Sequence, residues 1–136
     1  MDITVKNLQS KFPVLSSHIK TAVLKVCKEL RLLKQKSEIS VVFVSRQRMR
    51  SINKKYLGHD YVTDVITFDY RNLYAEIIIC PSAARANAKK FKTSMEKELI
   101  LYVIHGLLHL AGYDDRKPKD IQRMRLKEKQ LLDRLV

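Results

Sequence analysis

The chain has 136 residues, which is enough for one domain with a single hydrophobic core. Hydrophobic residues make up 46% of it, and no apolar run approaches the roughly 18 residues of a membrane-spanning helix, which argues against a helical membrane protein. Lysine and arginine number 27 against 14 acidic residues, and the net charge of +13 favours a polyanionic partner, RNA or DNA, over a merely basic soluble surface.

Apolar periodicity predicts strands mixed with helices along the whole chain. In chain order the predicted elements are strand 3–5, helix 15–33, strand 39–44, helix 46–56, strands 62–68 and 74–80, and helices 81–91, 95–111 and 118–132. Ser45 is a suitable cap for the basic helix that follows it, and Gly58-His59-Asp60 predicts a turn. Either Thr93 or Ser94 begins the fourth helix, and Thr93 with Glu96 fits a capping box.

The order of these elements indicates an α+β fold, with α/β-like layering, in one domain over residues 1–136. Helix 95–111 is apolar around much of its circumference, so we expect it at the centre, packed on a small sheet. Cys27 and Cys80 fall on apolar segments without a CxxC spacing, which favours buried reduced thiols over a disulfide or a metal ligand. The first residues show no signal-peptide pattern, so we expect a cytoplasmic protein with no membrane partner.

A metal-site pattern occupies one run near the end of the chain, His105-Gly-Leu-Leu-His109-Leu-Ala-Gly112-Tyr-Asp-Asp115. The two histidines are four residues apart and share one face of a helix, and Gly112 can end that helix in a left-handed conformation. The chain can then fold back so that Asp115 reaches the same point, with Asp114 as the competing ligand. Two imidazoles and a carboxylate leave a coordination position open for water, which argues for an enzyme rather than a structural metal site.

The spacing matches the metzincin arrangement of helix, glycine turn and third ligand. Both histidines lie in the most hydrophobic helix, where unpaired imidazoles are costly, and this favours a shared metal over two structural histidines. Metalloproteases with an HExxH motif use the glutamate after the first histidine as general base, whereas this chain has Gly106. The pattern therefore counts against peptide hydrolysis and leaves a metal-dependent hydrolase of another substrate as an alternative.

The run from His105 to Asp115 resembles the HGxLHLxGYDH signature of the YbeY family of metal-dependent endoribonucleases. Residues 52–68, INKKYLGHDYVTDVITF, resemble LNxxYRxxDxPTDVLSF of that family, and residues 75–80, AEIIIC, resemble its GDIxIC strand. The resemblance implies a small, mostly parallel four-stranded sheet surrounded by about five helices. It also implies a single-strand-specific endoribonuclease that acts in 16S rRNA 3′-end maturation and ribosome quality control.

The family holds zinc with three histidines, so the resemblance implies one Zn²⁺ per chain on His105, His109 and Asp115. The carboxylate is a harder ligand than imidazole and admits other divalent ions more readily. The implied partners are 16S rRNA in the ribosome or its small subunit, a ribosomal protein and a ribosome-associated GTPase. Leu57 stands where the family has a basic-cleft arginine, so that anion clamp is not carried over.

Candidate RNA-binding side chains lie in a basic segment that contains no acid: Arg46, Arg48, Arg50, Lys54 and Lys55. His59 could also supply positive charge. Thr63 and Asp64 match the family motif; they either shape the cleft and orient a histidine or form a local hydrogen bond at a strand end. With His59 they are the candidate cleft residues for catalysis, and either water or the RNA 2′-hydroxyl could attack.

The six tyrosines and four phenylalanines show no interleaved pattern of the kind found in RNA-binding sheets. One observation favours a rival function: Leu57 stands where the family has its cleft arginine. The alternative is therefore a ribosome-assembly factor that binds RNA with weak or no catalysis.

Overall fold

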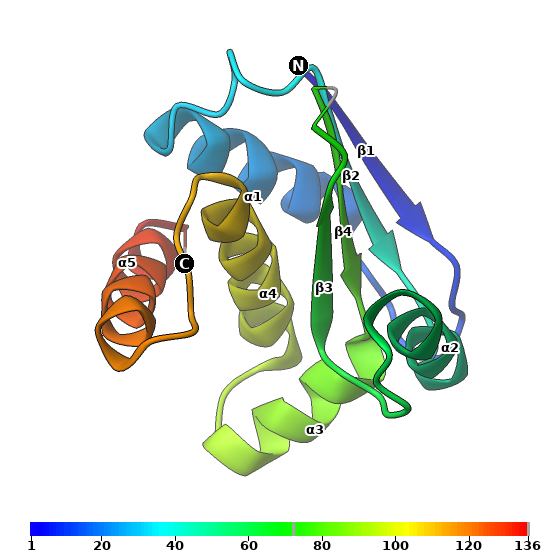
Figure 1. The fold of residues 1–136 in the computed structure, drawn as a ribbon. Helices are drawn as coiled ribbons and strands as arrows, with labels where there is room; N and C mark the ends of the chain where they lie inside the picture. Colours follow the sequence, from blue (N-terminus) through cyan, green and yellow to red (C-terminus); the bar gives the residue numbers. More distant parts are fainter. Residues whose placement is uncertain (72, 136) are drawn as a thin grey trace.

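The computed structural model describes residues 1–71 and 73–135 of the chain. Helices lie on both faces of a central four-stranded sheet (Figure 1). The helices are α1 (Ser16–Glu29), α2 (Arg46–Leu57), α3 (Pro81–Phe91), α4 (Met95–Leu110) and α5 (Pro118–Leu135). None of these described helices combines the length and the apolar composition that crossing a bilayer requires.

The strands of the sheet follow the order β1-β2-β4-β3. β1 (Asp2–Asn7), β2 (Glu38–Phe43) and β4 (Tyr74–Ile79) run parallel, whereas β3 (Val65–Asp69) runs antiparallel to β4. The predicted small, mostly parallel sheet in an α+β fold is therefore confirmed, and the antiparallel edge strand makes the sheet mixed.

Each face of the sheet has its own apolar cluster. The larger cluster joins α1, α4 and α5 to the inner sides of β2 and β4, with Ile39, Ile77 and Leu107 fully buried. The smaller cluster lies under α2, around Met49 and Ile66. Figure 1 shows α2 alone on its side of the sheet, with α4 between the sheet and α5 on the other. The prediction that helix 95–111 is central is confirmed.

Gly106 lets α4 lie directly on the sheet. A Cβ atom at this position would come within 2.9 Å of both Ile77 Cγ2 and Thr67 Oγ1. Both atoms are on carbons next to the strand backbone and cannot move aside without shifting the strand. Gly106 therefore allows α4 to pack tightly against β3 and β4.

Two predicted elements extend at least three residues beyond the observed ones. The strand predicted from residue 62 begins at Val65, because the Asp64 carboxylate accepts the Val65 N–H at 2.8 Å before the ladder starts. The helix predicted to residue 33 ends at Glu29, because Arg31 turns the backbone into the left-handed region (φ 58°). The amide of Leu32 then bonds the Cys27 carbonyl at 2.9 Å, which closes the helix end.

Ser94, not Thr93, caps α4. The Ser94 hydroxyl accepts the Lys97 N–H at 3.1 Å, while the Thr93 hydroxyl donates to the Glu98 carboxylate at 2.6 Å. The capping box predicted for Thr93 and Glu96 is therefore wrong. Glu96 instead lies 2.9 Å from the imidazole of His18 on α1, so a contact between two helices replaces the local one.

The cysteine prediction is confirmed, since Cys27 and Cys80 are both buried and unpaired. Burial raises the pKa of the Cys27 thiol to about 12, which keeps it protonated and unreactive.

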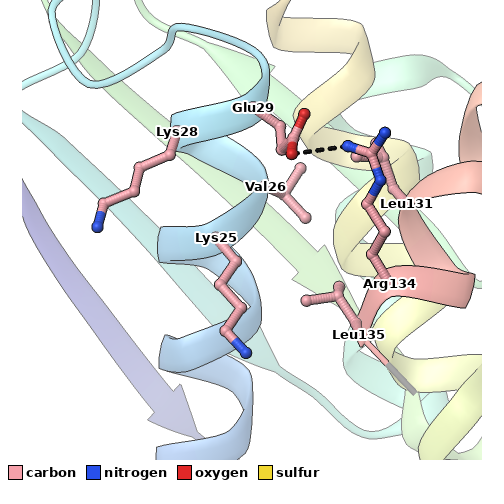
Figure 2. A pocket seen from close by; sticks show the side chains of 7 residues that line it. All are labelled: Lys25, Val26, Lys28, Glu29, Leu131, Arg134 and Leu135. Atoms are coloured by element: carbon pink, nitrogen blue, oxygen red, sulfur yellow. Dashed lines mark ion pairs between the residues drawn. The ribbon is translucent and has the colours of Figure 1, made fainter.

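The last helix is tied to the first across a hollow of about 510 Å³ (Figure 2). Arg134 of α5 pairs with Glu29 of α1 at 2.6 Å, and Val26 and Leu131 form the apolar floor between them. This contact helps to fix α5, which contributes to the site described next.

Candidate metal centre

The end of α4 brings the motif residues to one point. His105 and His109 share a face of the helix, which ends at Leu110. Gly112 takes a positive φ of 98°, its amide bonds the His109 carbonyl at 3.1 Å, and the Tyr113 amide bonds the Leu108 carbonyl at 2.9 Å. This pair of bonds is the glycine-terminated helix end known as the Schellman motif. It reverses the chain and returns it toward the two imidazoles.

Three ligand atoms converge after this turn. His105 Nε2 and His109 Nε2 lie 3.1 Å apart, and Asp115 Oδ2 lies 3.5 Å from each. Ligand atoms of a tetrahedral zinc site are about 3.3 Å apart, given metal–ligand bonds of about 2.0–2.2 Å. The donor set therefore fits one divalent cation. Asp114 is turned away, with its carboxylate 3.8 Å from Arg116, so the structure favours Asp115 over the competing acid.

Glu128 of α5 orients the first histidine. Its Oε1 lies 3.2 Å from Nδ1 of His105, which leaves Nε2 to face His109 and Asp115. Burial lowers the pKa of His105, but the hydrogen bond and charge of Glu128, with the charges of Asp115 and Asp64, outweigh it and raise the pKa above its ordinary value. The negative surroundings that favour the imidazolium also favour a bound cation.

Glu128 is not among the site residues predicted from the sequence. The available signal was weak: an acid in the middle of an otherwise basic amphipathic helix.

A cleft of about 470 Å³ opens beside the three ligands. The candidate residues His59, Thr63 and Asp64 all line it, together with Leu57. Asp64 accepts the Val65 amide and lies 3.4 Å from the Thr63 hydroxyl, so the local hydrogen bond at the strand end is present. Within the part of the chain that the structure describes, neither Thr63 nor Asp64 hydrogen-bonds to a site histidine.

Comparison with known proteins identifies the family. The family model described as Endoribonuclease YbeY matches residues 4–136. The chain belongs to the YbeY family. The Endoribonuclease YbeY of Azobacteroides pseudotrichonymphae is 33% identical over 138 residues, covering 99% of each chain. That of Chlorobium luteolum is 43% identical over 101 residues, covering 72% of this chain and 74% of the relative.

The fold is also that of a solved structure. The solution structure of a protein from Thermotoga maritima is 30% identical and superimposes with a TM-score of 0.68, covering 98% of this chain and 88% of the other. The sequence resemblance to the YbeY family is therefore confirmed over nearly the whole chain.

The five candidate RNA-binding residues of this YbeY-family chain lie together on α2, where all are exposed: Arg46, Arg48, Arg50, Lys54 and Lys55. They do not line the cleft itself. Arg50 pairs with Asp60 at 2.8 Å, and Lys54 lies 3.9 Å from the same carboxylate. The helix is therefore a basic surface beside the site, with part of its charge neutralised.

Proposed function

We propose that this protein is a zinc-dependent endoribonuclease that cuts single-stranded RNA in the cytoplasm, acting in 16S rRNA 3′-end maturation and ribosome quality control. The observation that carries the proposal is the convergence of His105, His109 and Asp115 beside an open cleft, in a chain of the YbeY family. The net charge of +13 suits a phosphodiester substrate.

The residues around the cation have distinct roles. His105 and His109 offer neutral Nε2 atoms, Asp115 offers a carboxylate, and Glu128 fixes the tautomer and orientation of His105. Two imidazoles favour Zn²⁺, and the carboxylate keeps the site open to other divalent ions such as Mn²⁺. When bound, a divalent cation supplies Lewis acidity that stabilises charge developing on a phosphoryl group.

The cleft residues complete the proposed site. His59 and the Thr63 hydroxyl line the cleft and are the candidates to move or hold a proton at the 2′-hydroxyl or at an attacking water. The basic face of α2 attracts the RNA backbone toward the cleft. The proposed partners are 16S rRNA in the ribosome or small subunit, a ribosomal protein and a ribosome-associated GTPase.

Gly106 argues against the peptidase alternative on structural grounds. A glutamate there would have to enter the packed contact with Ile77 and Thr67, so α4 cannot carry a protease base at this position without leaving the sheet.

The test is cleavage of a labelled single-stranded oligoribonucleotide with Zn²⁺, with Mn²⁺ and with a chelator, for the wild type, His109→Ala and His18→Ala. His18 is an exposed histidine on α1 and serves as the matched control. We expect cleavage by the wild type and His18→Ala, and loss of cleavage with chelator or in His109→Ala. RNA binding and ribosome association without metal-dependent cleavage would contradict the enzyme and favour the assembly factor.

A further inference from the structure

Aromatic rings, two of them exposed tyrosines, lie in and beside the metal cleft. Tyr61 and His59 both line the cleft, and their rings stack at 5.3 Å with an interplanar angle of 10°. Phe68 also lines the cleft, and the ring of Tyr56 packs edge-on against it at 5.5 Å. Tyr56 is 59% exposed and Tyr61 is 54% exposed. Large aromatic side chains are seldom left so open without a binding role when they gather at a site.

The loop that carries Tyr61 is held in place. The buried side chain of Asn53 donates to the Tyr61 carbonyl at 3.0 Å, and the His59 amide bonds the Asn53 carbonyl at 3.2 Å. Arg50 anchors the loop further through its 2.8 Å pair with Asp60. The loop backbone is therefore fixed while the rings of His59 and Tyr61 face solvent. Because the loop is already ordered, little conformational entropy is lost when a ligand stacks on these rings.

The electrostatics beside the rings suit a nucleic acid. Lys54, Lys55 and Arg50 lie on the same helix as Tyr56, and Asp60 offsets part of their charge. The Lys55 ammonium lies 5.2 Å from the centre of the Tyr56 ring. Aromatic faces next to a basic helix are the combination that binds single strands without reading sequence.

We propose that Tyr61 with His59, and Tyr56 with Phe68, are base-stacking positions for single-stranded RNA at the mouth of the metal cleft. The proposal rests on the proposed function and adds contacts to the bases of its substrate. Stacked bases hold the strand so that a phosphodiester between them reaches the cleft. Paired bases in a duplex cannot offer these faces, which accounts for a single-strand preference.

The test compares two fluorescent probes of equal length and charge: a single-stranded oligoribonucleotide and the same strand carrying abasic sites. Binding is followed by anisotropy with a chelator present, so that the RNA stays intact. We expect Tyr56→Ala and Tyr61→Ala each to weaken binding of the base-bearing probe about 5- to 100-fold. Binding of the abasic probe should change little.

Matched variants separate stacking from folding and charge. Phe91 on α3 is also 59% exposed, with the Lys90 ammonium 5.3 Å from its ring centre, so Phe91→Ala is the control for Tyr56→Ala. Tyr56→Phe should bind like the wild type, because stacking needs the ring and not the hydroxyl. Tyr61→Phe is not used for rescue, because the Tyr61 hydroxyl lies 3.2 Å from Nδ1 of His59 and helps to hold that ring pair. Thermal unfolding of each variant checks the fold.

The outcomes distinguish this inference from the function on which it rests. If the wild type cleaves RNA but the alanine variants bind both probes like the wild type, the stacking positions are wrong and the nuclease stands. Equal loss on both probes, or no rescue by phenylalanine, also overturns stacking. A wild type that neither binds nor cleaves RNA overturns both.

Discussion

Nδ1 of His105 and Oε1 of Glu128 lie 3.2 Å apart, although 23 residues separate them in the chain. The contact exists because α5 packs against α4 and is tied back to α1 by the Glu29–Arg134 pair. One candidate metal ligand is therefore oriented by a helix that supplies no candidate ligand of its own.

This relationship predicts the effect of Glu128→Gln. The amide keeps the shape of the side chain but loses the charge, so His105 becomes a weaker and less ordered ligand. We expect zinc affinity to fall about tenfold, at the lower end of the range for such outer-sphere changes. Competition with a chromophoric chelator measures it. Asp133→Asn, at an exposed position of the same helix, should leave the affinity unchanged.

Adjacent acids provide a second test. Asp115 Oδ2 lies 3.5 Å from both imidazoles, whereas Asp114 faces Arg116. We expect Asp115→Asn to abolish stoichiometric zinc binding and RNA cleavage, and Asp114→Asn to retain both. In contrast to Asp115→Asn, Asp115→His should bind zinc. Its RNA cleavage with Mn²⁺ should be weaker than that of the wild type, because imidazole is a softer ligand than carboxylate. The metal content of each variant is measured after dialysis. Equal effects of Asp115→Asn and Asp114→Asn would contradict the assignment of Asp115 as the ligand.

The close contact of α4 with the sheet predicts that Gly106→Ala is destabilising. Alanine gains about 1 kcal/mol of helix propensity over glycine, but its Cβ would lie 2.9 Å from buried side-chain atoms on two strands. Overpacking of this kind costs about 1–3 kcal/mol, so after the gain in helix propensity we expect a net loss of stability of up to about 2 kcal/mol. Urea unfolding measures it, and an unchanged midpoint would mean that the helix shifts freely.

Short-range signals account for what the sequence predicted well. The two histidines, the glycine turn and Asp115 lie within one helix end, where local backbone geometry alone brings them together. The strand was predicted to begin at residue 62 because β-branched residues favour strands. This boundary was wrong because the Asp64 carboxylate accepts the N–H of Val65, the first residue of β3.

Contacts between distant elements could not be predicted in this way. Glu128 meets His105 only through the packing of two helices. The aromatic rings near the cleft come from α2, the loop after it and β3, so their sequence spacing shows no pattern. Both features depend on tertiary structure rather than on periodicity.

The ion pair between the buried Lys36 and the partly exposed Asp69 predicts a pH dependence of stability. The hydrogen bond from Lys36, at 2.5 Å, lowers the pKa of the Asp69 carboxyl, with burial opposing and the Arg71 amide assisting. Because the folded-state pKa is below the unfolded value of about 3.9, the pair stabilises the fold above that pH. The contribution is lost as pH falls through the lower, folded-state pKa.

Asp69→Asn should therefore flatten the acid side of the stability profile. At neutral pH we expect the free energy of unfolding to fall by roughly 1–3 kcal/mol, because the buried Lys36 ammonium loses its partner. A value near the lower end is expected, because Asp69 is partly exposed and solvent screens the pair. Asp60→Asn is the control, since its pair with Arg50 is exposed. Denaturant unfolding between about pH 3 and pH 7 measures both. Parallel profiles for wild type and Asp69→Asn would show that the pair does not stabilise the fold.

Leu57→Arg should strengthen RNA binding. Leu57 lines the cleft and is 47% exposed, so an arginine there can reach a phosphate without displacing the core. We expect several-fold tighter binding of single-stranded RNA and a plot of log affinity against log salt that is steeper by about 0.7, the value for one added phosphate contact. Leu24→Arg, which adds the same charge at an exposed position of α1 outside the cleft, controls for net charge. Equal effects of the two substitutions would mean that overall charge, and not the cleft, determines RNA affinity.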